Sequence, residues 1–324
     1  MHNQPMNDFT ILVANGAFAS SVALTLDILS TAAVIAQRQG TAVPRWEICG
    51  VDTDCVTLGH GMQIAVQPLT TRFDDRSCWI IPGIGVADAL SLEHRLKQAD
   101  IALLIPALLS HVQSGGDVAA SCSGVFVLQA ANLLAGHCVT TSWWLAPLLR
   151  QWAPECQVDA DRMVIIDPPL ITAGAALGHS DLMLHLLRSR FSPALADAVA
   201  RALLIDGRQL QSPFMVPAMM AQGNELIAQL TAHIEDSLPA TISVGALASS
   251  FGLSERTLSR HVHKATGYSP LRLIQRVQAN KARELLANSK YSIDTIAEHV
   301  GYKDATSLRR LMKKMLNATP RQLR

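Results

Sequence analysis

The sequence predicts an α/β N-terminal domain with a mostly parallel sheet, followed by an all-α C-terminal domain of two helix–turn–helix units. Over residues 1–187, short apolar runs alternate with segments of helical periodicity, a pattern typical of strands and helices that follow one another along a chain. Over residues 241–324, one helical pattern occurs twice in the same order. We therefore expect three parts: an α/β domain over 1–190, a helical connector over 191–240 and a helical domain over 241–324.

The apolar runs of the N-terminal part predict seven strands and three helices. The expected strands are 9–13, 46–51, 78–81, 101–105, 118–121, 162–166 and 170–172. The expected helices are 22–36, 125–134 and a last one over 181–187. Asp167-Pro-Pro169 predicts a tight turn, and prolines 213, 217 and 239 predict breaks in the connector. This order of elements favours a sheet covered by helices on both faces.

The C-terminal repeat reads as helix, tight turn, helix in each copy. Ala248 and Ala297 lie 49 residues apart, and the turn glycines Gly252 and Gly301 have the same spacing. Glycine tolerates a positive φ at such a turn. Ser254 and Asp304 follow the glycines and predict N-caps for the second helices, because their side-chain oxygens accept from exposed backbone N–H groups.

The second helix of each copy has one apolar and one polar face. Leu258 and Val262 form the apolar face of the first, and Leu308, Leu311, Met312 and Met315 that of the second. This is a helix–turn–helix signature, whose second helix enters the DNA major groove. The segment 270–287 predicts one long helix that buries Leu271, Ile274, Val277, Ala282 and Leu285. This long helix would hold the two helix–turn–helix units so that they enter successive major grooves, roughly 34 Å apart. The alternative is a small helical bundle whose basic residues merely keep it soluble.

Polar side chains on the two second helices are the candidate DNA contacts. Candidates for base contact are Arg256, Ser259, Arg260, His263, Thr306, Arg309 and Arg310. Candidates for phosphate contact are Lys264, Lys281, Lys313 and Lys314. Arginine suits bidentate contact with guanine. The alternatives are that the arginines contact phosphate or a neighbouring carboxylate, and that the lysines are ordinary solvated side chains.

Charge divides the chain at the start of the repeat. Residues 241–324 carry 15 Lys and Arg against 5 Asp and Glu, a net charge of +10, whereas residues 1–240 carry 12 against 21, a net charge of −9. A basic helical domain attracts the phosphate backbone and loses affinity as salt rises. The predicted macromolecular partner is therefore double-stranded DNA, bound by the C-terminal domain.

Cysteine usage and hydropathy predict a cytoplasmic protein without metal or cofactor. All six cysteines lie in the acidic part, and none forms a metal-type CxxC pair. Reduced thiols in the cytosol are the simplest account. No run approaches the roughly 20 uninterrupted apolar residues that span a bilayer, and the N-terminus has no basic region of a secretory leader.

One local feature could carry chemistry. Ser121-Cys122-Ser123-Gly124 follows a strand and precedes an apolar helix, a sharp turn that exposes its central residue and places a helix N-terminus beside it. Such a setting lowers a thiol pKa and can stabilise an oxyanion. A nucleophile also needs a base, and the next residue is Ser123. A buried structural cysteine is favoured, a pocket wall comes next, and catalysis is third.

The C-terminal domain resembles the AraC family of transcription regulators over about residues 241–324. The residues that carry the resemblance are Leu247, Ala248, Gly252, Ser254, Arg260, Gly267, Ser269, Pro270, Ala282, Leu285, Leu286, Ile293, Ile296, Ala297, Gly301, Tyr302, Arg310, Lys313, Pro320 and Arg324. Departures from the family pattern are Val262, Leu308, Met312, Asn317 and Leu323. The resemblance implies a sequence-specific regulator, expected to be an activator with RNA polymerase as a further partner. It also favours Arg256, Arg260, Thr306 and Arg310 as the base contacts.

The N-terminal domain is similar to the ThiJ/PfpI-like branch of the class I glutamine amidotransferase superfamily, which has a flavodoxin-like fold. The carrying segments are 81–83, the elbow 121–124, 133–136, 140–144, 171–174 and 181–186. The two domains in this order resemble the GlxA-type subgroup of AraC regulators. That resemblance implies a homodimer whose N-terminal domain senses a small nitrogenous metabolite such as an amino acid, carnitine or a betaine.

Departures from the superfamily argue against an enzyme. Ser123 and Ser142 stand where relatives often carry histidine, and the segment 15–20 has no glutamate. The elbow is therefore expected to bind an effector; the candidate residues are Asn15, Phe18, Gly83, Cys122, Ser123, Ser142, Trp143 and Gly174. Trp143 and Trp144 could hold a quaternary ammonium, although core packing is the favoured reading. The alternative functions are a cysteine hydrolase or amidase with a DNA-binding appendage, and an architectural protein without a ligand.

Overall fold

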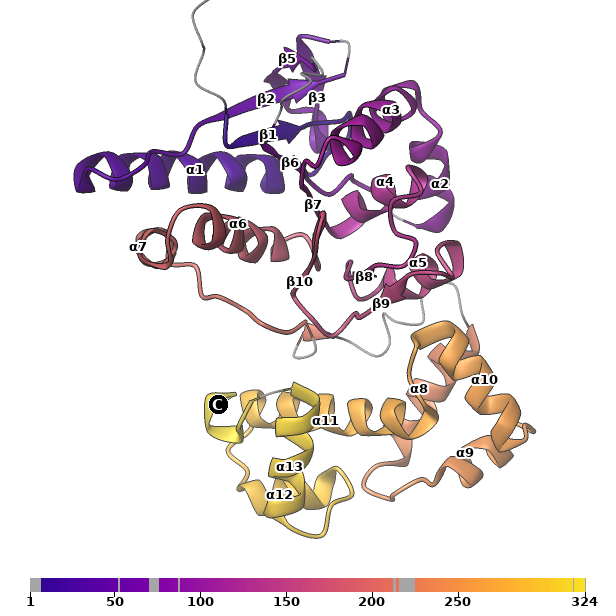
Figure 1. Ribbon diagram of the computed structural model, residues 1–324. Helices are drawn as coiled ribbons and strands as arrows, with labels where there is room; N and C mark the ends of the chain where they lie inside the picture. Colours follow the sequence, from indigo (N-terminus) through magenta and orange to yellow (C-terminus); the bar gives the residue numbers. More distant parts are fainter. Residues whose placement is uncertain are drawn as a thin grey trace, which may run out of the picture. The chain divides into compact units, whose positions relative to one another are not determined.

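The computed structural model describes residues 7–51, 53–69, 76–86, 88–211, 214–215, 225–316 and 318–323. The chain forms two compact units, 1–211 and 212–324 (Figure 1). The first is an α/β unit and the second is helical, so the predicted fold class is confirmed.

A seven-stranded sheet forms the centre of the N-terminal unit, in the order β10-β11-β7-β6-β1-β2-β5. These strands are β1 (Phe9–Leu12), β2 (Trp46–Gly50), β5 (Gln67–Pro68), β6 (Cys78–Ile81), β7 (Val118–Ser121), β10 (Val164–Asp167) and β11 (Leu170–Ala173). Every neighbouring pair is parallel except β10 and β11, which are joined by the predicted turn at Pro168-Pro169. Strands β1, β6, β7 and β11 are buried along their whole length, as expected for a sheet covered on both faces.

Helices cover the two faces of this sheet, with α1, α6 and α7 on one and α2 to α4 on the other (Figure 1). The helices are α1 (Ala19–Gln39), α2 (Ala89–Leu96), α3 (Ala99–Gln113), α4 (Val125–Ala130), α5 (Ala146–Trp152), α6 (Gly178–Arg190) and α7 (Pro193–Ala202). Two small sheets, β3 (Cys55–Thr57) with β4 (Gln63–Ala65) and β8 (Cys138–Val139) with β9 (Gln157–Val158), complete the unit with the short turns Gly59–Gly61 and Cys122–Gly124.

The prediction of a strand at 101–105 is wrong, because these residues lie inside helix α3. A short apolar run fits a buried strand and a buried helix equally well. The buried positions Ile101, Leu104 and Leu108 have helical spacing, whereas Leu103, in the middle of the run, is 54% exposed. Only one side of the run therefore contacts the core, which a fully buried strand would not allow.

Helix α1 is the one described helix long and apolar enough to cross a membrane by length and composition. The same properties suit a core helix. Ile28, Leu29 and Ala32 are fully buried in one hydrophobic cluster with strand β1 and helix α6. The apolar character of α1 is thus accounted for by its contacts within the α/β unit.

The C-terminal unit consists of helices around two small cores. Its helices are α8 (Glu225–Ser237), α9 (Val244–Ser250), α10 (Glu255–Thr266), α11 (Pro270–Asn288), α12 (Ile293–His299) and α13 (Ala305–Leu316), followed by the turn Pro320–Gln322. Helix α11 serves both cores: Leu273, Ile274 and Val277 pack with α8, α9 and α10, whereas Ala282 and Leu286 pack with α12 and α13. One rigid helix therefore joins the two copies of the repeat.

Local geometry at the two turns is as predicted. Gly252 and Gly301 have φ values of 63° and 82°. The Ser254 Oγ accepts from the Thr257 N–H at 3.2 Å, and the Asp304 Oδ1 accepts from the Ser307 N–H at 2.8 Å. Both predicted N-caps are confirmed.

Helix α11 differs from prediction at its first turn, where Leu271 is 54% exposed. Leu273 occupies the core instead, because the buried face runs through 273, 274 and 277 and position 271 falls outside it. The predicted connector contributes to both units: α7 packs in the first and α8 in the second. The predicted breaks at prolines 213 and 217 lie outside the described residues, as does Asn317.

Candidate DNA interface and elbow site

The exposed face of α10 carries the first set of candidate DNA contacts. Leu258 and Val262 are fully buried on the opposite side, which fixes the rotation of the helix. The side chains that the sequence placed on the polar face are exposed: Arg256, Ser259, Arg260, His263 and Lys264. They come from successive turns of one helix and form a continuous basic strip.

The exposed face of α13 carries the second set. Its exposed side chains are Thr306, Arg309, Arg310, Lys313 and Lys314, opposite the buried Leu308, Leu311, Met312 and Met315. The N-cap carboxylate of Asp304 is charged: the Ser307 N–H, with a smaller contribution from the Arg310 charge, lowers its pKa from the ordinary value. Arg310 therefore lies within electrostatic reach of a carboxylate of its own helix.

The four lysines predicted to contact phosphate lie in different environments. Lys264 and Lys313 stand on the exposed faces of α10 and α13. Lys281, on α11, forms an ion pair with Glu284 at 3.0 Å. The Lys314 Nζ donates to the Gln275 Oε1 at 3.3 Å, across from α13 to α11.

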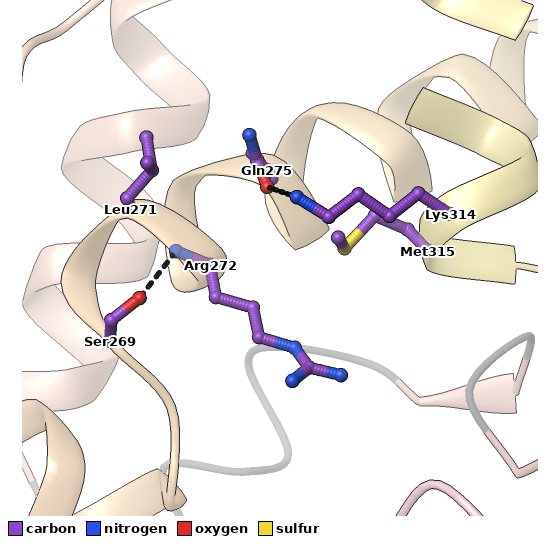
Figure 2. Close-up of a pocket in the computed structure, with 6 residues that line it drawn as sticks. All are labelled: Ser269, Leu271, Arg272, Gln275, Lys314 and Met315. Carbon is purple, nitrogen blue, oxygen red and sulfur yellow. Dashed lines mark hydrogen bonds between the residues drawn. The ribbon is translucent and has the colours of Figure 1, made fainter. Parts of the chain in front are cut away.

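Lys314 also lines an open pocket of about 260 Å³ between the start of α11 and the end of α13 (Figure 2). Arg272 points along the same pocket, and the remaining lining residues are Ser269, Leu271, Gln275 and Met315. The side chain of Leu271 is exposed because it lies at the edge of this pocket rather than in the core.

In the N-terminal unit, the elbow has the geometry that its sequence predicts. Strand β7 ends at Ser121, and Cys122 then adopts a φ of 55°, a conformation uncommon for a residue other than glycine. Its N–H donates to the Gly174 carbonyl at 2.9 Å, and its carbonyl accepts from the Thr141 Oγ1 at 2.6 Å. These two contacts hold the strained residue from opposite sides.

The Cys122 thiol is buried and surrounded by hydroxyl groups. It is 2% exposed, and the Ser142 Oγ donates to its sulfur at 2.9 Å. Burial raises the pKa of this thiol above its ordinary value, which the hydrogen bonds from Ser142 and Ser123 only partly offset. A buried, neutral thiol is what the favoured reading of Cys122 as a structural cysteine predicts, because loss of solvation outweighs the hydrogen bonds to the sulfur.

Six of the eight predicted pocket residues come together at the elbow. The Phe18 N–H donates to the Gly83 carbonyl at 2.8 Å. A Cβ on Gly83 would lie 3.0 Å from the Cys122 Cβ and 3.0 Å from the Phe18 ring, so a larger residue there would press on both side chains. Cys122 in turn contacts Ser123, Ser142 and Gly174.

The other two pocket candidates have other contacts. The Asn15 Oδ1 accepts from the Thr57 N–H at 3.1 Å, and the Asn15 carbonyl accepts from Arg95. Asn15 therefore ties the loop after β1 to β3 and α2. Trp143 is 5% exposed and meets the Trp144 ring edge to face at 5.3 Å, as expected for packing tryptophans.

Comparison with known proteins agrees with this two-part organisation. A helix-turn-helix domain family matches residues 247–324. The transcriptional regulator GbdR of Pseudomonas aeruginosa is 24% identical over 292 residues, covering 89% of this chain and 77% of the relative. The transcriptional activator RhaS of Escherichia coli O157:H7 is 37% identical over 95 residues, covering 29% of this chain and 34% of the relative.

The chain is a helix-turn-helix DNA-binding transcription regulator.

Solved structures show the fold of the N-terminal part of this regulator. A ThiJ/PfpI family protein from Pseudomonas syringae matches with a TM-score of 0.52 at 16% identity, covering 71% of this chain and 88% of that one. An AraC family transcriptional regulator from Pseudomonas putida matches with a TM-score of 0.50 at 18% identity, covering 61% and 100%. The N-terminal part of the regulator thus has the fold of that ThiJ/PfpI family protein and precedes the helix-turn-helix domain.

The sequence did not indicate His179, a fully buried residue of this regulator that lies under the elbow. Its Nε2 is 2.6 Å from the Thr25 Oγ1, and its Nδ1 is 2.8 Å from the Ser121 Oγ. Because the Thr25 hydroxyl already donates to the Ser21 carbonyl, Nε2 carries the ring proton and Nδ1 accepts from Ser121. Burial lowers the pKa of His179 to about 4, so the ring is neutral and joins α1, β7 and α6.

Gln211 is the second residue that the sequence did not indicate. It is 1% exposed, and its carboxamide contacts the Thr140 hydroxyl and the backbone of residues 141, 160, 162 and 175. No local signal could have identified it, because these partners lie between 36 and 71 residues away along the chain.

Proposed function

We propose that this regulator is a homodimeric, cytoplasmic transcription activator that binds a specific DNA sequence under the control of a small metabolite. The observation that carries the proposal is the pair of exposed basic faces on α10 and α13, joined by the single helix α11. RNA polymerase is the partner that activation requires. The ligand is a small nitrogenous metabolite bound at the elbow.

The two faces differ in the side chains that they present. Helix α10 offers Arg256, Ser259, Arg260 and His263, whereas α13 offers Thr306, Arg309, Arg310 and Lys313. Because base pairs differ in the donors and acceptors that they expose in the major groove, unlike side chains select unlike bases. One polypeptide therefore reads an asymmetric site with two different half-sequences.

Control by a ligand is supported by the chemistry of the elbow. Cys122, the strained residue of the elbow, provides a neutral thiol. Phe18 adds an aromatic ring beside it, and Ser142 adds a hydroxyl. A ligand shifts DNA binding only through a difference in its affinity for two arrangements of the protein. The elbow serves as a binding site rather than a catalytic one in this proposal, because hydroxyl groups of Ser123 and Ser142 contact the Cys122 sulfur and its raised pKa disfavours the thiolate.

A salt titration on a selected DNA duplex tests the DNA-binding part. The duplex is obtained by selection with the full chain from a random-sequence pool. For about six phosphate contacts, affinity falls on the order of 10³-fold between roughly 50 and 200 mM salt. Lys264→Gln and Lys313→Gln each lower the slope of log K against log salt by about one. Affinity that hardly responds to salt contradicts the proposal.

Cys122→Ser separates the regulator from a cysteine hydrolase or amidase. A regulator shows slow alkylation of Cys122, and with this substitution it retains its affinity for the selected duplex. A hydrolase instead shows rapid, pH-dependent alkylation of Cys122 and turnover that disappears in Cys122→Ser. Measured turnover of that kind would replace the proposed role of the elbow.

A further inference from the structure

Gln211 is the last residue of the N-terminal unit, and the chain beyond it leads to the DNA-binding unit. Its backbone N–H donates to the Asp161 carbonyl at 2.8 Å, and Leu210 forms a β-bridge with Arg162. The exit of the chain from the α/β unit is therefore fixed along one strand-like segment.

The Gln211 carboxamide fills a polar slot. Its Nε2 lies 2.9 Å from the Thr141 carbonyl, 3.0 Å from the Arg162 carbonyl and 3.1 Å from the Ala160 carbonyl, and its Oε1 accepts from the Ala175 N–H at 3.1 Å. Carbonyl oxygens only accept, and an N–H only donates, so the orientation of the amide is determined by its partners. A glutamate at 211 would place an anion against three carbonyl oxygens.

The slot and the elbow share the same two segments of backbone. Thr141, whose carbonyl accepts from Gln211, donates its hydroxyl to the Cys122 carbonyl, and the next residue, Ser142, donates to the Cys122 sulfur. On the other side, Ala175 donates to Gln211, and its neighbour Gly174 accepts from the Cys122 N–H. Each side of the elbow is thus at most one residue away from a contact of Gln211.

We propose that Gln211 is the positioning residue that couples the elbow to the chain segment leading to the DNA-binding unit. A change at Cys122 alters the positions of Thr141 and Gly174, which changes how firmly the slot holds Gln211. Binding of DNA to the C-terminal unit in turn affects the elbow through Gln211, because coupling between two sites is reciprocal. This inference rests on the proposed function.

Gly174 provides an independent way to displace the carboxamide. A Cβ on Gly174 would lie 2.2 Å from the Gln211 Cδ and 2.6 Å from its Nε2, far inside contact distance. Gly174→Ala therefore displaces the side chain while residue 211 stays glutamine. In a Gln211→Ala background the same substitution has no carboxamide to displace, so the two effects are non-additive.

The experiment measures the alkylation rate of Cys122 by iodoacetamide in the full chain, resolved by peptide mass spectrometry, with and without saturating selected duplex. In the wild type, duplex changes the rate roughly threefold or more. In Gln211→Ala and Gly174→Ala, the rate without duplex rises roughly tenfold, because the backbone around the elbow opens more often. The ratio of rates with and without duplex falls to about 1 in both variants. The double variant has the same alkylation rate and the same ratio as either single variant.

Gln129→Ala is the matched control, because it removes a carboxamide that donates to a backbone carbonyl of the same unit, that of Trp152, which is not a partner of Gln211. It keeps the wild-type rate and ratio. A ratio that stays at its wild-type value in Gly174→Ala or Gln211→Ala overturns the inference while the proposed function stands. A wild-type ratio of 1 also overturns it. Failure to select any duplex overturns the proposed function and the inference together.

Discussion

At the scale of single residues, the proposed reading of bases depends on the exposed side chains of α10 and α13. Arg260 and Arg310 occupy equivalent places in the two copies of the repeat, and both are exposed. Helical periodicity sufficed to predict their exposure, because burial of Leu258 and Leu308 sets the rotation of each helix. The bound complex sets whether each guanidinium contacts a base or a phosphate, and Arg310 has Asp304 of its own helix as a further partner within electrostatic reach.

Arg260→Ala and Arg310→Ala are expected to weaken binding and to relax sequence choice at one position of each half-sequence. A bidentate arginine–guanine contact contributes about 1–3 kcal/mol of discrimination. Competition of each variant against duplexes substituted at single positions measures this. Equal loss of affinity on all sequences would instead assign these arginines to phosphate.

His179 makes the stability of the N-terminal unit pH-dependent. Its pKa is lowered from 6.5 to about 4 in the folded state, so between these pH values the unfolded chain binds a proton that the folded chain does not. Stability is full above pH 6.5 and falls as pH drops toward 4, by up to roughly 3 kcal/mol. Urea unfolding followed by tryptophan fluorescence reports this unit alone, because all five tryptophans lie before residue 153.

His179→Gln removes the titrating group and is expected to flatten this pH dependence, whatever its effect on stability at neutral pH. His94→Gln, at an exposed histidine of α2, serves as the control and retains the wild-type slope. An unchanged slope in His179→Gln would assign the acid sensitivity to other groups.

At the scale of elements, local signals predicted the main strands and both helix–turn–helix turns. Six of the seven expected strands form, with ends within two residues of those predicted, and α6 begins three residues earlier than expected. The helix expected over 125–134 ends at Ala130, and the sequence did not indicate α2, α5 or the short strands β3, β4, β5, β8 and β9. The strand expected at 101–105 is a helix, because an apolar run has no local feature to separate helix from strand and the rest of the domain decides between them.

The two turn glycines are expected to differ in their tolerance of alanine. Both have positive φ, which costs an alanine about 1–2 kcal/mol. A Cβ at Gly252 would meet nothing within 4 Å, whereas at Gly301 it would lie 2.9 Å from the Pro239 carbonyl oxygen. Gly301→Ala is therefore the more destabilising substitution in urea unfolding followed by far-ultraviolet circular dichroism. Equal losses would show that the Pro239 backbone moves away at little cost.

At the scale of the whole molecule, the change in net charge separates the elbow from the candidate DNA contacts. The acidic N-terminal part contains the elbow, and the basic part contains the exposed basic faces of α10 and α13. Tryptophans occur only in the first unit and tyrosines only in the second, so each unit has its own optical signal.

A metabolite that binds the elbow is expected to stabilise the first unit selectively. At a ligand concentration of about 100 times Kd, binding adds roughly 2.7 kcal/mol to the unfolding free energy of the unit that binds it. Thermal unfolding followed by tryptophan fluorescence, screened with amino acids, betaines and polyamines, identifies the compound. A ligand that shifts only the tyrosine signal would place the sensor site in the C-terminal unit.

The sequence by itself determined the two kinds of domain, the duplicated reading unit, its caps and glycines and the residues of the elbow. These depend on helical or strand periodicity and on residues that are neighbours in the chain. Tertiary structure alone decided that the Cys122 thiol is buried with a raised pKa and that His179 is neutral. It alone placed Gln211 in a slot behind the elbow. Burial and long-range hydrogen bonds arise only when segments distant in sequence pack together.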